Sequence, residues 1–162
     1  MIREIIANIL CPFVGTIGYS VLYNVPRRYY FSCGMTGMAG WIVYLSIVKF
    51  TVLSAAIASF FGTVVVVLIS RMLTVRLKCP VTVFLISGIF PLVPGAGVYY
   101  TAYYLVMEQL SLAAERGLEA LKVAFGIVLG IAVVLSVPRE FFQPGYWRQR
   151  KYRIRKKETR KL

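Results

Sequence analysis

A short stretch rich in proline and glycine interrupts an apolar part of the chain and offers main-chain groups for binding. Pro91, Pro94, Gly95 and Gly97 fall within seven residues of the apolar segment 80–107. Each proline removes a backbone donor and clashes with the preceding turn, so no regular helix continues through them. Inside a bilayer, the freed carbonyl and N–H groups are costly unless protein or water satisfies them. The stretch therefore indicates either a binding site or a kink packed against neighbouring helices.

The chemistry that such a break supports is anion binding at a helix N-terminus. A helix that restarts near Val98 would point its free N–H groups and the positive end of its dipole at the break. A carboxylate bound there gains about 0.3–2 kcal/mol from the dipole, which favours weak and reversible capture. Tyr99 and Thr101 follow directly and add hydroxyl groups, although aromatic residues near an interface also form membrane belts.

Most catalytic chemistry is excluded by the residue types that the chain lacks. It contains no histidine and no aspartate, so neither a Ser-His-Asp triad nor a histidine-based zinc site is available. The cysteines Cys11, Cys33 and Cys79 lack C-x-x-C spacing and favour neither a disulfide framework nor a metal site. We expect no enzymatic activity, no metal ion and no cofactor.

Proton coupling would need an acidic group close to the apolar segments. Carriers that couple to protons generally use a buried Asp, Glu or His. Glu4 and Glu108 are the acids nearest to the apolar segments, and both fall at predicted segment ends that water reaches. Glu108 is the candidate for such a role at a cavity mouth. Otherwise a partner supplies the acid, or the process does not use protons.

The composition places these residues in a membrane protein. Of the 162 residues, 59% are hydrophobic and 15% are charged, whereas soluble domains carry about 25% charged residues. So few charged side chains cannot cover a water-soluble core of this size. We therefore predict an all-α polytopic membrane protein and exclude a soluble globular enzyme.

Five apolar segments are long enough to cross a hydrocarbon layer, which takes about 20 residues. They span residues 5–24, 29–48, 50–70, 80–107 and 118–138. The break at Lys49 is the weakest, since no other charge lies between residues 29 and 70. The sequence predicts about five transmembrane helices, the fourth broken at Pro91–Gly97, in a membrane domain of residues 1–140 followed by a basic tail of residues 141–162.

Basic residues gather at alternate ends of the predicted segments. One side holds Arg27, Arg28, the run from Arg71 to Lys78 and the tail, whereas the other side holds few basic residues, accompanied by acids. The positive-inside rule then predicts an outward N-terminus and a cytoplasmic C-terminus. This assignment depends on an odd number of crossings.

The tail from Trp147 onward holds much of the formal net charge of +13. It is too charged to be buried and too short to fold alone, so we interpret it as a solvated topology anchor. Attraction to anionic lipid contributes about 1 kcal/mol per basic residue near the surface. We expect no nucleic acid partner, because no folded recognition module accompanies the charge.

Small residues recur at helical spacing in three of the segments. They are Gly34, Gly37 and Gly40, then Ala55, Ala58, Ser59 and Gly62, and then Gly126 and Gly130. This pattern predicts close helix packing. A lone five-helix chain does not need three such faces for its own packing. The pattern therefore favours a second membrane subunit that covers one of them.

In combination, these features resemble the threonine/serine exporter (ThrE-type) family. The residues that carry the resemblance are, in chain order, Pro12-Phe-Val-Gly-Thr-Ile-Gly-Tyr-Ser-Val-Leu-Tyr-Asn-Val-Pro-Arg-Arg, the helix Gly34–Gly40, Pro91-Leu-Val-Pro-Gly-Ala-Gly-Val-Tyr, and Leu135-Ser-Val-Pro before the basic tail. The likeness covers nearly the whole chain. Its most specific parts are Asn24-Val25-Pro26 and Pro94-Gly95, in combination and at this spacing. The chain looks like the small single-domain subunit.

The resemblance implies an exporter of threonine and serine, or of dicarboxylates in related systems, in the bacterial inner membrane. In that family the small subunit works with a larger five-helix subunit. The substrate-binding residues that it implies, together with those of the break, are Asn24, Pro91, Pro94, Gly95, Gly97, Tyr99 and Thr101. Some relatives carry a histidine after the small-residue helix, where this chain has Met38-Ala39-Gly40-Trp41, so the coupling and the substrate can differ.

Two other interpretations stay open at this point. The chain can be a non-transporting structural or assembly subunit whose partner holds the site, and a membrane-embedded enzyme is the third. The preferred hypothesis is a subunit of a two-component exporter that moves a small carboxylate-bearing solute outward by alternating access. The sequence names neither the substrate, nor the coupling ion, nor the subunit stoichiometry.

Overall fold

A computed structural model describes residues 2–137, with side chains from residue 6 onward, and every regular element in this range is helical. The α-helices are α1 (Ile2–Leu22), α2 (Tyr30–Phe50), α3 (Ala55–Leu77), α4 (Thr82–Ile89), α5 (Gly95–Val106) and α6 (Leu110–Ser136). Single 3-10 turns precede α2 and follow α4: η1 (Arg27–Tyr29) and η2 (Phe90–Leu92). The predicted all-α fold is confirmed, whereas the proposed domain boundary at residue 140 lies outside the described residues.

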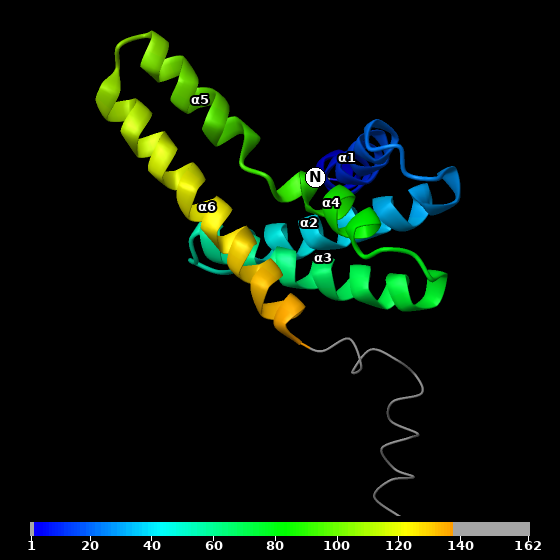
Figure 1. The fold of residues 1–162 in the computed structure, drawn as a ribbon. Helices are drawn as coiled ribbons and strands as arrows, with labels where there is room; N and C mark the ends of the chain where they lie inside the picture. The colour runs from blue at the N-terminus through cyan, green and yellow to red at the C-terminus, as the bar shows by residue number, and fades with distance from the viewer. Residues whose placement is uncertain (1, 138–162) are drawn as a thin grey trace, which may run out of the picture.

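The helices form a bundle with one projecting hairpin (Figure 1). Helix α1 packs against α2, α2 packs against both α3 and α4, and α3 packs along α6. Helix α5 packs chiefly against α6, and these two helices extend together away from α1, α2 and α4. The break between α4 and α5 is therefore the point where the chain leaves the bundle.

Three helical segments in the described part are long and apolar enough to cross a membrane. They are Arg27–Phe50, Ala55–Leu77 and Leu110–Ser136. Thr82–Leu92 and Gly95–Val106 make a fourth span if they act as one, and they are bent by 54° at their break. The polytopic membrane fold and its broken fourth segment are confirmed. The apolar part of α1, Ile6–Leu22, is shorter, and its crossing stays a prediction.

Several predicted helix boundaries were wrong, because they followed the apolar stretches alone. Helix α3 continues to Leu77, so Arg71 lies inside a helix and not in a loop. Helix α6 begins at Leu110 rather than at residue 118. Its first turns consist mostly of Leu, Ala, Glu, Arg and Lys, which favour helix in water as well as in lipid. The charged residues assigned to a loop therefore lie on α6: Glu115, Arg116, Glu119 and Lys122.

Small residues bring the helices of this chain close to one another. A β-carbon added at Gly37 would collide with Thr16 of α1. One at Gly62 would lie 3.0 Å from the carbonyl oxygen of Gly40, and one at Gly130 would lie 2.9 Å from that of Phe60. Close helix packing is confirmed. All three small-residue faces are occupied within the chain, however, so the argument that one is left over for a partner was wrong.

Arg71 ties α3 to the end of α6. Its side chain is 8% exposed, and its guanidinium donates hydrogen bonds to the carbonyl oxygens of Leu135, at 2.9 Å, and of Val137. The last carbonyls of a helix lack intrahelical donors and carry the negative end of its dipole. A buried cation at this position therefore holds the C-terminal end of α6 against α3.

Replacing Arg71 should separate these helix ends. We expect Arg71→Gln to lower the free energy of unfolding by about 1.5–3 kcal/mol, because charge-assisted hydrogen bonds to buried carbonyls are lost. Thermal unfolding in detergent micelles measures the change. Arg76→Gln is the matched control, since Arg76 lies on the same helix and is exposed. Equal stability of the two variants would contradict the role of Arg71.

Candidate solute site at the helix break

The break consists of a single 3-10 turn followed by a tight turn at Pro94. The N–H group of Val93 donates to the carbonyl of Phe90 at 3.3 Å, and that of Gly95 donates to the carbonyl of Val93 at 2.8 Å. Pro94 has φ −76° and ψ 55°, the geometry of an inverse γ-turn. Helix α5 then starts directly at Gly95, three residues earlier than the predicted restart near Val98. The chain therefore presents an early helix N-terminus at the break.

The described residues form a pocket on each of two sides of the break. The first, which we call the α3 pocket, has a volume of about 310 Å³. It is lined by Ser54, Ala55, Ala56, Pro94, Gly97, Glu119, Ala120, Lys122 and Val123. The second, the α1 pocket, also has a volume of about 310 Å³. It is lined by Ala7, Asn8, Cys11, Pro12, Gly15, Trp41, Phe90 and Pro91.

Two helix N-termini meet at the α3 pocket. Ala55 and Ala56 belong to the first turn of α3, and Gly97 belongs to the first turn of α5. N–H groups in a first helical turn have no intrahelical acceptor, and they carry the positive end of the helix dipole. Ser54, which precedes α3, makes no capping hydrogen bond with its side chain. The first turn of α3 is therefore left without this cap.

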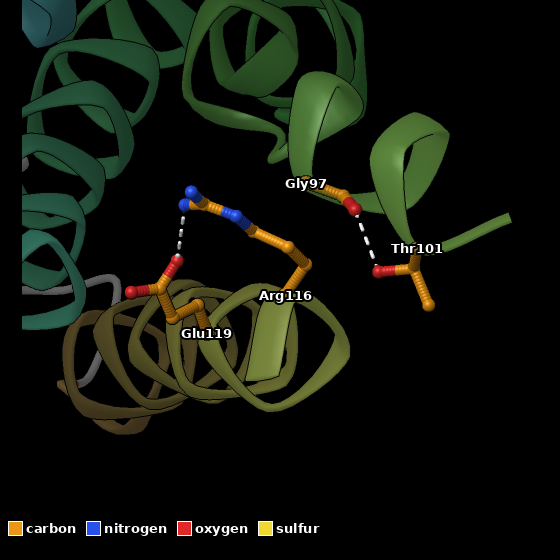
Figure 2. A network of polar contacts seen from close by, with 4 residues as sticks. All are labelled: Gly97, Thr101, Arg116 and Glu119. Atoms are coloured by element: carbon orange, nitrogen blue, oxygen red, sulfur yellow. Dashed lines mark hydrogen bonds and ion pairs between the residues drawn. The ribbon is translucent and has the colours of Figure 1, made fainter. Parts of the chain in front are cut away.

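Charged side chains of α6 complete the α3 pocket. Lys122 and Glu119 both line it. Arg116 pairs with Glu119 at 3.1 Å, and both side chains are at least half exposed, so this pair is weak. Figure 2 shows this pair on α6 beside Gly97 and Thr101 of α5. The pocket thus offers N–H groups and an ammonium to an anion, and a carboxylate to a cation.

The predicted proline and glycine candidates lie at the break, but they divide between the two pockets. Pro94 and Gly97 line the α3 pocket, whereas Pro91 lines the α1 pocket. A β-carbon at Gly97 would lie 3.1 Å from that of Ala120, so this glycine permits close contact between α5 and α6. At Gly95 a β-carbon would meet no atom within 4 Å. Gly95 therefore contributes the start of α5 and no packing contact.

Tyr99 and Thr101 are placed less favourably for binding. Tyr99 is 65% exposed, lies edge-on to Tyr100 and lines neither pocket. The Thr101 hydroxyl donates to the carbonyl of Gly97 at 2.7 Å (Figure 2). Thr101 lines an apolar groove of about 460 Å³ between α5 and α6. The exposed tyrosine is typical of an interfacial belt.

The structure does not bring Asn24 or Glu108 to the break. Asn24 lies in the turn after α1, and Glu108 lies in the turn between α5 and α6. Both are exposed and have left-handed backbone conformations, with φ of 52° and 57°. Neither residue lines the α1 pocket or the α3 pocket.

Sequence reasoning missed the polar residues that face the break from other elements. Glu119 and Lys122 were assigned to the break before the last segment, and Ser54, Asn8 and Trp41 were not considered as binding residues. Asn8 had a recognisable signal, because it is an amide in an apolar helix and lies four residues before Pro12. The others required the tertiary arrangement.

Long apolar helices, one broken pair and pockets beside the break define a multi-pass α-helical membrane protein. The sequence model of a family described as "Threonine/Serine exporter, ThrE" matches residues 8–137. The chain belongs to this family, which is a family of membrane transporters and not of enzymes, and the resemblance seen in the sequence is confirmed. No curated protein and no solved structure matches the chain significantly.

The two glycines of the break should respond differently to the same substitution. We expect Gly97→Val to destabilise the protein by about 1–3 kcal/mol, because the added atoms push α5 away from Ala120. Gly95→Val is the matched control, and its effect should stay near 0.5 kcal/mol, since the space around Gly95 is open. Melting temperatures in detergent micelles measure both. A Gly95→Val variant at least as unstable as Gly97→Val would refute this packing.

Proposed function

We propose that the chain is the small subunit of a two-component exporter that moves threonine, serine or a related small solute out of the cell. Membership of the threonine/serine exporter family supports the solute class. The observation that carries the proposal is the α3 pocket, where two helix N-termini and Lys122 meet beside a break in a membrane segment. The same break separates α5 from the rest of its segment, so the α3 pocket lies at a point where the membrane segment can bend.

The α3 pocket fits a zwitterion better than it fits a dianion. The carboxylate of an amino acid would accept hydrogen bonds from the first-turn N–H groups of α3 or α5 and from Lys122. Its ammonium would face the carboxylate of Glu119. A dicarboxylate would bring a second negative charge to Glu119, which is unfavourable. We therefore favour threonine and serine over dicarboxylates as solutes.

Alternating access would move α5 and the part of α6 that contacts it relative to the bundle, while the rest of α6 stays packed on α3. Helix α5 contacts chiefly α6, and the chain bends by 54° where α5 leaves α4. A rocking motion about Val93 and Pro94 would therefore change the α3 pocket without unfolding a helix. With the N-terminus outside, the loop before α3 faces outward, and the α3 pocket opens on the side where an exporter releases its solute.

The proposed partner is a larger five-helix subunit of the same family. Support comes from α5, which has no buried residue although it is an apolar helix. Its exposed large side chains are Val98, Tyr99, Tyr100, Tyr103, Leu105 and Val106. A second subunit would cover part of this face. We also propose an inner-membrane location, a cytoplasmic C-terminus and adhesion of the basic tail to anionic lipid. The C-terminus and the tail lie outside the described residues.

Export of labelled threonine from cells tests the proposal. We expect export to require both this chain and its partner subunit. Lys122→Gln should raise the apparent KM for threonine about two- to tenfold, the effect of losing a hydrogen bond worth about 0.5–1.5 kcal/mol. Lys49→Gln is the matched control, because Lys49 is exposed at the same end of the bundle and does not line the pocket.

The alternatives give different outcomes in the same cells. If the partner alone exports threonine at the full rate, this chain is a structural or assembly subunit. If Lys122→Gln and Lys49→Gln behave alike while both chains are needed, the substrate site does not lie in the α3 pocket. If succinate leaves the cells and threonine does not, the preference for a zwitterion is wrong.

A further inference from the structure

The α1 pocket lies on the other side of the break and has a different chemical character. Helix α1, helix α2 and the turn η2 form its walls, and Figure 1 shows α1 on the opposite side of α2 and α4 from the hairpin of α5 and α6. Unlike the α3 pocket, it has no Lys, Arg, Asp or Glu among its described lining residues. Its hydrogen-bonding capacity comes chiefly from Asn8.

Asn8 brings hydrogen-bonding groups to this pocket that the described residues do not satisfy. It lines the pocket, and its side-chain amide makes no hydrogen bond with the described residues. Its main-chain carbonyl also loses its helical donor, since Pro12 lies four residues later and has no N–H group. The nearby hydroxyl of Thr16 does not replace this donor, because it donates to the carbonyl of Pro12 at 2.6 Å.

Trp41 of α2 forms part of the wall of the pocket. Its indole Nε1–H is buried and has no acceptor among the described residues, so a solute in the pocket meets the ring and not this N–H group. Asn8 and Trp41 approach from different helices, so a molecule in the pocket can contact both elements.

The α1 pocket adjoins the break. Phe90 and Pro91 line the pocket and belong to the 3-10 turn η2, with which the break begins. Tyr19 of α1 stacks on Phe90 with ring centroids 4.0 Å apart. A solute that fills the pocket therefore lies between α1 and the turn that leads to Val93 and Pro94.

We propose that the α1 pocket is a second binding site, which takes the ammonium or hydroxyl end of a small amino acid. The carbonyl oxygens of Asn8, in its side chain and its main chain, accept hydrogen bonds from that end. An anion is disfavoured, because the described lining residues offer no cationic side chain and no helix N-terminus. The inference rests on the proposed function for the ligand class, a small amino acid, and for the choice of threonine as the probe.

Cys11 provides a natural reporter of occupancy, since it is exposed and lines the α1 pocket. Cys33 is buried, and Cys79 is removed by the substitution Cys79→Ala. The purified protein in lipid vesicles is treated with a small methanethiosulfonate reagent, and labelling of Cys11 is followed by mass spectrometry. Threonine at about ten times its Kd should occupy about 90% of the sites and slow labelling about tenfold. Succinate should not slow it.

The variant Asn8→Leu should abolish protection by threonine, and Asn8→Ala repeats the test with a smaller side chain. Ser46→Ala is the control that should keep protection, because Ser46 is exposed on α2 and does not line the pocket. Melting temperatures show that each variant is folded. The proposal is overturned if threonine leaves the labelling rate unchanged, if it protects the Asn8 variants as well as the parent, or if succinate protects equally.

The labelling result is independent of the export result. If threonine protects Cys11 in a chain that does not support export, the result supports the second site and refutes the proposed function. Export that depends on Lys122, together with unprotected Cys11, would support the proposed function and refute the second site. The two failures are therefore distinguishable in one set of variants.

Discussion

The rest of this structure depends on the requirement that main-chain polar groups inside a membrane find partners. Helices meet most of this requirement in the described part of the chain, but between Ile89 and Gly95 two prolines remove donors and the chain turns at Pro94. A joint of this kind is tolerated only where protein or a polar cavity surrounds it. The α1 and α3 pockets lie at this break, which is the physical reason for proposing solute binding there.

The packing of the other helices fixes one side of the break and leaves α5, on the other side, able to move. Glycines bring α1, α2 and α3 into close contact, and Arg71 holds the end of α6 against α3. Helix α5 lacks such ties and touches chiefly α6. A hairpin that is anchored at one end and apolar along its free face is suited both to movement and to contact with another subunit. This asymmetry is the structural basis for the movement of α5 that we propose.

The elements that follow from local chemistry were predictable from the sequence, and those that follow from tertiary contacts were not. The broken segment was predictable, because two prolines and two glycines within seven residues interrupt a helix, whereas the lone Pro12 lies inside α1. The start of α6 was not, since hydropathy marks where lipid begins and not where helix begins. Lys122 and Ser54 are distant in sequence and meet only when α3 and α6 pack. Asn24 and Glu108 looked informative in the sequence but lie in exposed turns.

Amide hydrogen exchange at the break, followed by mass spectrometry in lipid nanodiscs, tests the central claim most directly. The account predicts that the amides of residues 96 and 97 exchange much faster than those of residues 58–67 in α3, because these first-turn N–H groups at the break have no main-chain acceptor and meet water. Threonine should slow exchange at residues 96 and 97 and leave residues 58–67 unchanged. Exchange at residues 96 and 97 that is as slow as in α3 and does not respond to threonine would contradict the account.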